Sequence, residues 1–308
     1  MKQQLGFFVL LCLLCSGILL FPYKKEQFGA TVEEKTLADE TVILRVLHGE
    51  QVEQMTLSRY LAGVVSGELT EDFPIEAKKA QAVAARTFAL RRATEGKHEG
   101  ADICTDSSCC QAWDPVPSET ALQAVRETDG LVLIYEEELI EATYFSCSGG
   151  RTESAEAVWG NAVPYLQAVD SPGEEDAPRF REEIELTGES FIARLQTLYP
   201  ELVPWGEPYE WFGEISYTNG NGVDSVEICG IPIEGIQLRK LFGLRSTNIR
   251  FSVNAEAITI STLGYGHRVG LSQYGARAMA LEGELFSEIL SHYYKNTEIK
   301  RLSLSEEA

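Results

Sequence analysis

Hydrophobic residues occur in short blocks along most of the chain, and one longer apolar run stands near the N-terminus. Leu5 to Phe21 contains 17 apolar or small residues and no charge, which is at the short end for a helix that spans a membrane. Residues 26–40 are polar and acidic, as is typical of a linker. We therefore expect a transmembrane helix that anchors the chain over residues 1–22 and an acidic linker over 23–40.

Two other processing routes compete with an uncleaved anchor. A cleavable signal peptide normally ends at a small-residue site, and the apolar run is not followed by one. A lipoprotein would need a small residue before its cysteine, whereas Leu11 and Leu14 precede Cys12 and Cys15. Lysines flank the run on both sides, so charge does not determine which way the anchor points.

After residue 40 the pattern changes between the two-residue repeat of strands and the 3.6-residue repeat of helices. Leu57, Leu61 and Val64 fall on one face of a helix, and Pro74 is well placed to open a second helix that runs to about Arg92. We also expect strands at 41–48 and 52–57, a helix at 118–128, a hairpin of 131–135 with 139–145, and helices at 188–198, 276–283 and 285–294. Short strands that alternate irregularly with helices predict an α+β fold.

Glu68 continues the apolar face of the first helix, since it lies seven residues after Leu61 and four after Val64. Burial there would disfavour the charged carboxylate and raise its pKa, as a general acid near neutral pH requires. Alternatively, Gly67 ends the helix and leaves Glu68 solvated at its C-terminus. The periodicity alone leaves both interpretations open.

The acidic charge balance of the chain makes some classes of binding partner unfavourable. The chain has 47 Asp and Glu against 26 Lys and Arg, a formal net charge of -21, which argues against nucleic-acid binding and gives no attraction to an anionic bilayer. Acids are dense at 171–189, whereas 77–94 carries only bases. Arg91 and Arg92 suit the dipole at a helix C-terminus. Lys79 and Arg86 share a helix face, and we expect them to bind an anionic or hydroxyl-rich substrate.

One histidine and three cysteines lie close together in the sequence: His98, Cys104, Cys109 and Cys110. An imidazole and three thiolates form a plausible tetrahedral zinc set, although the spacing differs from the usual Cys-x-x-Cys knuckle. If the domain lies outside the reducing cytosol, a disulfide such as one between Cys104 and Cys109 is an equal alternative.

A glycine-rich segment near the C-terminus, residues 264–276, reads GYGHRVGLSQYGA. Its glycines permit tight backbone geometry close to a ligand. His267 and Ser272 do not lie in a nucleophile elbow. We therefore interpret His267 as a hydrogen-bonding pocket residue rather than as the base of a serine nucleophile.

Four segments together resemble the stage II sporulation protein D family of peptidoglycan lytic transglycosylases. They are YLAGVVSGELTEDFPIEAKKAQAVAARTFAL at 60–90, the cysteine loop at 98–113, YFSCSGGRTESAEAVWGNAVPYLQAV at 144–169 and GYGHRVGLSQYGARAMA at 264–280. The resemblance implies a membrane-anchored, extracytoplasmic catalytic domain over 41–300, with core segments 56–170 and 260–300, a more variable middle at 171–259 and a tail at 301–308. Mixed helices and short antiparallel strands would surround a glycan-binding cleft.

The resemblance also assigns roles to single residues. Glu68 matches the catalytic glutamate, and the substrate-binding positions correspond to Lys79, Arg86, Tyr144, Ser146, His267, Ser272 and Gln273. His98, Cys104, Cys109 and Cys110 fit the ligands of a structural zinc that some members bind. Arg268, where the family commonly has glycine, and Cys147 depart from the family's pattern, which leaves fine specificity open.

The implied reaction is glycosidic cleavage without water. Glu68 would protonate the oxygen between muramic acid and glucosamine and then accept a proton from the C6 hydroxyl, which closes a 1,6-anhydro ring. The implied substrate is glycan stripped of stem peptides by the amidase stage II sporulation protein P. The membrane protein stage II sporulation protein M would join them at the mother-cell membrane in septal peptidoglycan degradation and forespore engulfment. The alternative is a non-catalytic wall-binding protein that enhances an amidase.

Overall fold

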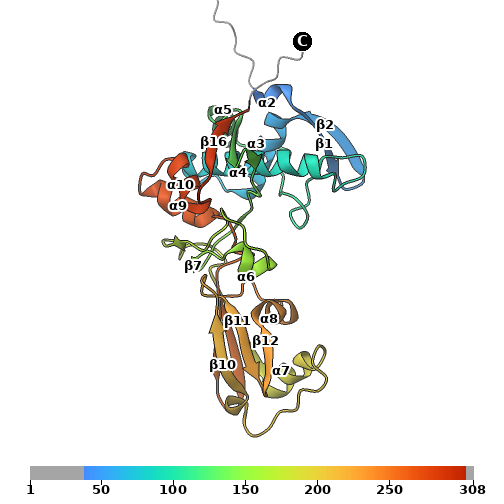
Figure 1. Cartoon of the computed structure of the whole chain (residues 1–308), viewed down its shortest axis with the longest axis vertical. Helices are drawn as coiled ribbons and strands as arrows, with labels where there is room; N and C mark the ends of the chain where they lie inside the picture. Colours follow the sequence, from blue (N-terminus) through green and yellow to red (C-terminus); the bar gives the residue numbers. More distant parts are fainter. Residues whose placement is uncertain (1–37, 303–308) are drawn as a thin grey trace, which may run out of the picture. The chain divides into compact units, whose positions relative to one another are not determined.

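Helices α3 (Leu57–Glu68) and α4 (Ile75–Glu95) lie at the centre of the region that carries the candidate site (Figure 1). The computed structural model describes residues 38–302, so the predicted anchor at 1–22 and most of the predicted linker lie outside the described residues. The Thr56 side chain caps α3 by accepting a hydrogen bond from the Arg59 amide. Within residues 38–302, no helix combines the length and the apolar character needed to cross a membrane.

The small side chains of α4 allow it to be packed on nearly all sides. Ala80 and Ala84 belong to a hydrophobic cluster with α9 (Gln273–Leu281) and α10 (Phe286–Tyr293). Ala85 and Ala89, on the other side of the helix, belong to a second cluster with α3 and α5 (Glu119–Glu127). α4 therefore holds the helix that ends in Glu68 close to the C-terminal segment of the chain.

Short strands surround these helices. They are β1 (Ile43–His48), β2 (Gln51–Thr56), β3 (Ile103–Cys104), β4 (Leu131–Tyr135), β5 (Glu138–Leu139), β6 (Tyr144–Phe145), β15 (Leu271–Ser272) and β16 (Glu298–Arg301). β2, β1 and β3 form one sheet, β16, β4 and β5 form another, and β6 pairs with β15 in parallel. Helices thus mix with small sheets, and the α+β prediction is confirmed.

The predicted hairpin between 131–135 and 139–145 is only partly formed, which corrects the prediction for its second strand. Glu136 and Glu137 adopt positive φ, as a two-residue hairpin turn requires, and β4 pairs with the short β5. The chain then leaves β4, and β6 pairs with β15 instead. This parallel pairing brings the late glycine-rich loop beside Tyr144 and Phe145.

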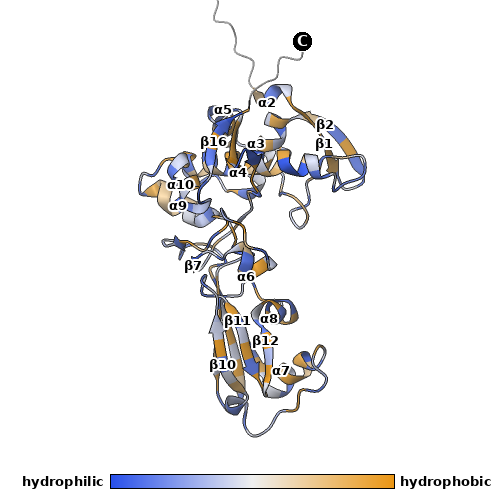
Figure 2. Ribbon diagram, viewed as in Figure 1, coloured by the Kyte–Doolittle hydropathy of each residue, from blue (hydrophilic) through white to orange (hydrophobic). Residues whose placement is uncertain are grey.

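Residues 181–263 build a region with its own hydrophobic core. Its elements are β9 (Arg181–Thr187), α7 (Gly188–Leu195), the 3-10 helix η1 (Pro208–Glu210), β10 (Phe212–Tyr217), β11 (Val223–Ile228), β12 (Ile231–Glu234), α8 (Gly235–Phe242), β13 (Ile249–Val253) and β14 (Ala257–Leu263). Two three-stranded sheets, β13-β14-β9 and β10-β11-β12, surround a cluster that includes the buried Phe191, Val226 and Ile260. Figure 2 shows hydrophilic and hydrophobic residues mixed along these strands, as expected for sheets with one buried face.

Residues 38–41 and residues 171–189 both contribute buried side chains and regular elements to the described structure. Residues 38–40, which we expected at the end of the linker, belong to the short helix α2 (Ala38–Thr41), in which Asp39 is 1% exposed and its carboxylate pairs with Arg86 of α4 at 2.6 Å. The acid-rich stretch 171–189 contains the buried Glu174 and the strand β9.

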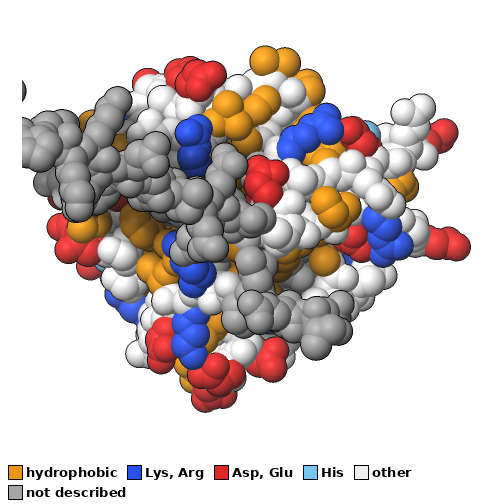
Figure 3. All heavy atoms as spheres, turned by 90° about the horizontal axis from the view of Figure 1, so that it is seen from above, with side chains coloured by type: hydrophobic (Ala, Val, Ile, Leu, Met, Phe, Trp, Pro, Cys, Tyr) orange, Lys and Arg blue, Asp and Glu red, His pale blue; other side chains and the backbone are white. Residues whose placement is uncertain are grey.

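Charged side chains of both signs lie on the surface of the protein. Figure 3 shows Lys and Arg side chains scattered among acidic ones on one face of the protein. The acidic excess of the composition is therefore mixed with basic side chains on this face.

Candidate active site and metal centre

Glu68 is the last residue of α3, and its carboxylate is held by three donors from three different segments. Oε1 accepts hydrogen bonds from the Ala112 amide at 2.9 Å and from the Tyr144 hydroxyl at 3.4 Å. Oε2 accepts from Gln273 Nε2 at 3.0 Å. The helix therefore does not end before Glu68, and the side chain is bonded within the protein rather than solvated.

Two glycines of α3 bring the Ala112 amide to this carboxylate. A Cβ at Gly63 would lie 2.1 Å from Trp113 Nε1, and a Cβ at Gly67 would lie 2.7 Å from the Trp113 backbone nitrogen. Any side chain at these positions would push the cysteine loop away from the helix. Trp113 Nε1 also donates to the Tyr60 carbonyl at 3.1 Å, which fixes the loop on α3.

Burial raises the pKa of Glu68 above its ordinary value, and the hydrogen bonds from Ala112, Gln273 and Tyr144 only partly oppose that shift. Burial, together with the nearby charge of Glu68, raises the pKa of Tyr144 well above its usual range. Tyr144 therefore remains a protonated donor at neutral pH. A carboxyl with a raised pKa beside fixed donors has the properties of a general acid.

Glu68 opens into a cavity of about 760 Å³, which is large enough for a small oligosaccharide. Its lining consists of Glu68, Phe88, Arg92, Ser107, Ser108, Cys109, Cys110, Thr143, Tyr144, Phe145, Ser146, Trp159, Tyr265, Gly266, His267 and Gln273. Five of the residues predicted to act in catalysis or substrate binding thus meet in one space: Glu68, Tyr144, Ser146, His267 and Gln273.

Aromatic side chains form one wall of this cavity. Trp159 ends the short helix α6 (Ala155–Trp159) and keeps 43% of its surface exposed. The His267 ring lies between Trp159 and Phe145, with ring centroids 5.8 Å and 5.6 Å away. Burial, with a contribution from the charge of Arg239, lowers the pKa of His267 to about 4, so the imidazole is neutral at pH 7. An uncharged aromatic wall suits the apolar faces of sugar rings.

Ser272, which we expected to bind substrate, is fully buried and does not line the cavity. Its hydroxyl donates to the buried carboxylate of Glu174. The same carboxylate accepts from the Ser148 and Gly149 amides, at 2.8 and 2.9 Å, and from the Ser171 hydroxyl at 2.8 Å. Ser272 therefore fixes the loops behind the cavity, which corrects the expected direct contact.

Arg268 has a structural explanation. It adopts φ 66°, a conformation in which glycine is unstrained, and its guanidinium is fully buried. Nε donates to the Ser148 carbonyl at 2.6 Å, and Nη2 donates to the carbonyls of Arg151 at 2.7 Å and Gly220 at 2.5 Å. The Gly220 bond ties the late loop to the turn between β10 and β11, and the other two bonds tie it to residues 148–151. Together they offset the cost of the backbone conformation.

The two cations expected beside Glu68 lie elsewhere. Arg86 has no exposed surface and donates through Nε and Nη2 to Asp39, so it offers no atom to a substrate. Lys79 is bonded to Glu76 at 2.8 Å and to Glu127 at 2.6 Å, and it does not line the cavity. The shared helix face was predicted correctly, but it faces α2 and α5 rather than the cavity, which corrects both assignments.

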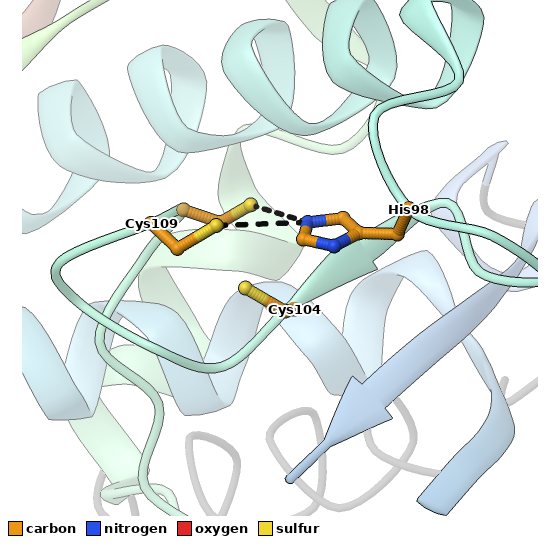
Figure 4. A group of neighbouring side chains, drawn as sticks. His98, Cys104 and Cys109 are labelled. Carbon is orange, nitrogen blue, oxygen red and sulfur yellow. Dashed lines mark hydrogen bonds between the residues drawn. The ribbon is translucent and has the colours of Figure 1, made fainter. Parts of the chain in front are cut away.

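The histidine and the three cysteines of the 98–110 loop converge, as Figure 4 shows for the labelled His98, Cys104 and Cys109. The donor atoms of these residues and Cys110 all lie within 4.8 Å of one another. His98 Nε2 is 3.3 Å from Cys110 Sγ and 3.8 Å from Cys109 Sγ. Ligand atoms around tetrahedral zinc lie about 3.5–3.8 Å apart, given Zn–N and Zn–S bonds of roughly 2.1 and 2.3 Å. The three cysteines are free, and the arrangement of the four donor atoms is compatible with a metal ion.

Sequence reasoning missed several residues of the site. Trp159 and Tyr265 lie within two of the segments that carry the family resemblance, but neither residue was predicted to line the site, although glycines beside both indicate turns. Arg92 was interpreted only as a cation at a helix end, yet it lines the cavity. Glu174 stood in an acid-rich stretch, where no pattern distinguishes one buried carboxylate from its exposed neighbours.

Comparisons with known proteins show which family the chain resembles. A family model described as Stage II sporulation protein matches residues 48–135. The chain is 33% identical to stage II sporulation protein D of Bacillus subtilis (strain 168), over 97% of this chain and 96% of that protein. Stage II sporulation protein D of Bacillus amyloliquefaciens is 33% identical over 94% of this chain and 92% of its own length. An amidase enhancer of Bacillus subtilis (strain 168) is 27% identical over 77% of this chain and 40% of its own length. With this similarity extending over nearly its whole length, the chain belongs to the stage II sporulation protein D family.

Proposed function

We propose that the protein is a lytic transglycosylase that cleaves the bond between muramic acid and glucosamine in peptidoglycan strands. One observation carries the proposal: among the described residues that line the cavity, Glu68 is the only carboxylate. A glycosidase that uses water normally places two carboxylates across the bond. A single carboxyl that acts first as acid and then as base is sufficient when the sugar's own C6 hydroxyl replaces water.

In this mechanism Glu68 begins protonated and donates to the glycosidic oxygen. Gln273 and the Ala112 amide, which already bond the carboxylate, stabilise the anion that this transfer leaves. The anion then accepts the C6 hydroxyl proton as the C6 oxygen bonds to C1 of muramic acid, which regenerates the acid. The neutral His267 takes no proton in either step.

The product assay tests this proposal directly. The purified full chain is incubated with glycan strands that an amidase has stripped of stem peptides, and the fragments are analysed by mass spectrometry. We expect ends that carry 1,6-anhydromuramic acid. Fragments with ordinary reducing ends would indicate a hydrolase, and intact strands would exclude catalysis.

A second candidate function is the enhancement of an amidase without catalysis, because a relative with that name aligns with 77% of the chain. An enhancer needs the cavity but not a protonated Glu68. If the chain stimulates a cell-wall amidase on intact peptidoglycan, and Glu68→Gln stimulates it equally, enhancement is a function of its own. Both activities can reside in one protein, so the product assay decides the first independently.

We further propose that His98, Cys104, Cys109 and Cys110 hold a structural zinc ion. Their donor atoms supply all four tetrahedral positions, so such an ion would have no open position for substrate. Zinc would rigidify the loop that presents the Ala112 amide to Glu68. Metal analysis of protein purified under reducing conditions is expected to give about one equivalent of zinc, falling below about a tenth in Cys104→Ser. Wild type with less than a tenth would exclude the site.

Trp159 is expected to bind sugar through stacking. Trp159→Ala should weaken binding of a glycan tetrasaccharide about tenfold in calorimetry, because a stacked aromatic contributes about 1 kcal/mol or more. Trp205→Ala is the matched control, since Trp205 is 52% exposed and does not line the cavity. Equal losses in the two variants would show that the effect does not come from the cavity.

The setting of this activity is also a proposal. The chain would be held in the mother-cell membrane by a single helix at 1–22, with the catalytic domain outside the cytoplasm. Its substrates would be septal glycan strands during engulfment, and its partners the amidase stage II sporulation protein P and the membrane protein stage II sporulation protein M. Similarity to two stage II sporulation proteins supports the link to sporulation.

A further inference from the structure

The cavity beside Glu68 has one charged donor. Among its described lining residues, Arg92 is the only Lys or Arg. It lies one helical turn after Phe88, another lining residue, and its guanidinium carbon is 4.8 Å from the centre of the Phe88 ring. The aromatic ring supports the guanidinium from one side, which leaves its edge available to a ligand.

The bonds of Arg92 leave part of its hydrogen-bonding capacity unused. Nη2 donates to Glu141 at 2.5 Å, and Nη1 donates to Glu95. A guanidinium has five N–H groups, and Arg92 Nε is buried without a partner. The remaining N–H groups on Nη1 and Nη2 can donate hydrogen bonds to the two oxygens of an oxyanion, and the side chain keeps 23% of its surface exposed.

Arg91 completes this arrangement, because it pairs with the same two glutamates. Its Nε lies 3.3 Å from Glu95 and 3.2 Å from Glu141. Arg91 does not line the cavity, and it also donates to the Leu139 carbonyl. When a ligand binds Arg92, Arg91 can therefore continue to pair with both glutamates.

We propose that Arg92 recognises the free lactyl carboxylate of muramic acid and thereby selects glycan from which the stem peptide has been removed. The inference rests on the proposed function, and it adds the side chain and the substrate group that would distinguish stripped glycan from intact glycan. In an intact strand this carboxylate is converted into a neutral amide by the first residue of the stem peptide. In a stripped strand each muramic acid carries one negative charge. A cavity with one cation therefore distinguishes the two without any contact to the peptide itself.

The test compares two ligands that differ only in this group. They are a tetrasaccharide of alternating glucosamine and muramic acid with free lactyl carboxylates, and the same tetrasaccharide with the carboxylates converted to amides. Both are titrated into the full chain carrying Glu68→Gln, so that no cleavage occurs. We expect the acid to bind about five- to tenfold tighter than the amide, as a partly exposed charge-assisted contact provides.

Arg92→Gln in the same background should bring this ratio close to one while the affinity for the amide stays within about twofold. Arg91→Gln is the matched control, since it removes ion pairs to the same glutamates yet leaves the cavity lining intact, and it should preserve the ratio. Glu95→Gln, which releases one bond of Arg92, should raise the affinity for the acid about twofold.

The ratio is measured within one variant, so partial loss of folding does not imitate the result. The inference is overturned if Arg92→Gln keeps the preference for the acid, or if Arg91→Gln loses it equally. If both ligands bind with equal affinity to the starting protein, selection by charge is excluded while the proposed function stands. If neither ligand binds, the proposed function fails together with the inference.

Discussion

Glu68→Gln is expected to lower the formation of anhydromuramic ends by about a thousandfold, the scale that a positioned general acid contributes. The amide has nearly the same shape as the carboxyl, and its oxygen can still accept from the Ala112 amide. It cannot donate a proton to the glycosidic oxygen. Glycan binding should remain within about threefold of wild type, because the cavity wall is unchanged.

The control for this variant is Glu71→Gln. Glu71 lies three residues further along the chain, its side chain is 72% exposed, and it does not line the cavity. We expect its product formation to match wild type. A Glu68→Gln protein that retains more than about a tenth of wild-type activity would exclude Glu68 as the acid.

The pH dependence of kcat/KM provides a second measurement on the same group. Burial raises the pKa of Glu68, so the carboxyl stays protonated to a higher pH than an ordinary glutamate. Activity should therefore be present below that pKa and fall as the pH rises through it. The Gln273 bond stabilises the anion and lowers the pKa, so Gln273→Met should move the falling limb to higher pH. A shift to lower pH would contradict this account.

Arg86→Met is expected to lower the free energy of unfolding by about 3–5 kcal/mol, as measured by chemical denaturation. The substitution leaves the Asp39 carboxylate in a buried site without its ion partner, and Asp39 is 1% exposed. Arg86 Nη1 also donates to the Leu131 carbonyl at 3.0 Å, and that bond is lost as well. The effect should be on stability, and glycan affinity of the folded fraction should not change.

Lys79→Met is the matched control on the same helix. Its ion pairs with Glu76 and Glu127 are partly exposed, so we expect a loss below about 1 kcal/mol. Adding Asp39→Asn to Arg86→Met should restore part of the lost stability, since no buried charge is then left unpaired. If Arg86→Met instead weakened glycan binding without destabilising the fold, Arg86 would have to face substrate after all.

The helices and the catalytic candidate could be predicted because their signals are local. The apolar repeat of α3 placed Glu68 on an inward face, and the spacing of His98 and the cysteines indicated a group of metal ligands. Partners distant in sequence could not be predicted. Arg86 meets Asp39 from a segment that looked like a linker, and no periodicity within α4 indicates what lies opposite it.

Partners distant in sequence also determine the roles of Ser272 in the late loop and Glu174 in the acidic stretch, so neither role could be predicted. Ser272 and Gln273 are adjacent in sequence, but one is bonded to Glu174 behind the cavity and the other to Glu68 inside it. The strand pairing of β6 with β15 decides this difference. Pairing in parallel between residues more than a hundred positions apart leaves no short-range pattern from which it could be read.

The pairing of Arg181 with Leu263 has a consequence for how such a protein can be rebuilt. The chain leaves the catalytic part at Arg181 and returns to it at Leu263, and these two residues are paired on neighbouring strands. Residues 182–262 therefore form an insertion whose two ends lie close together. A shorter connection, or an unrelated module whose ends lie equally close, could replace it without changing the path of the remaining backbone. Such an exchange would remove the bond from Arg268 to the Gly220 carbonyl. Because Arg268 would then keep its positive φ without that bond, glycine would be the better residue at position 268 in the shortened protein.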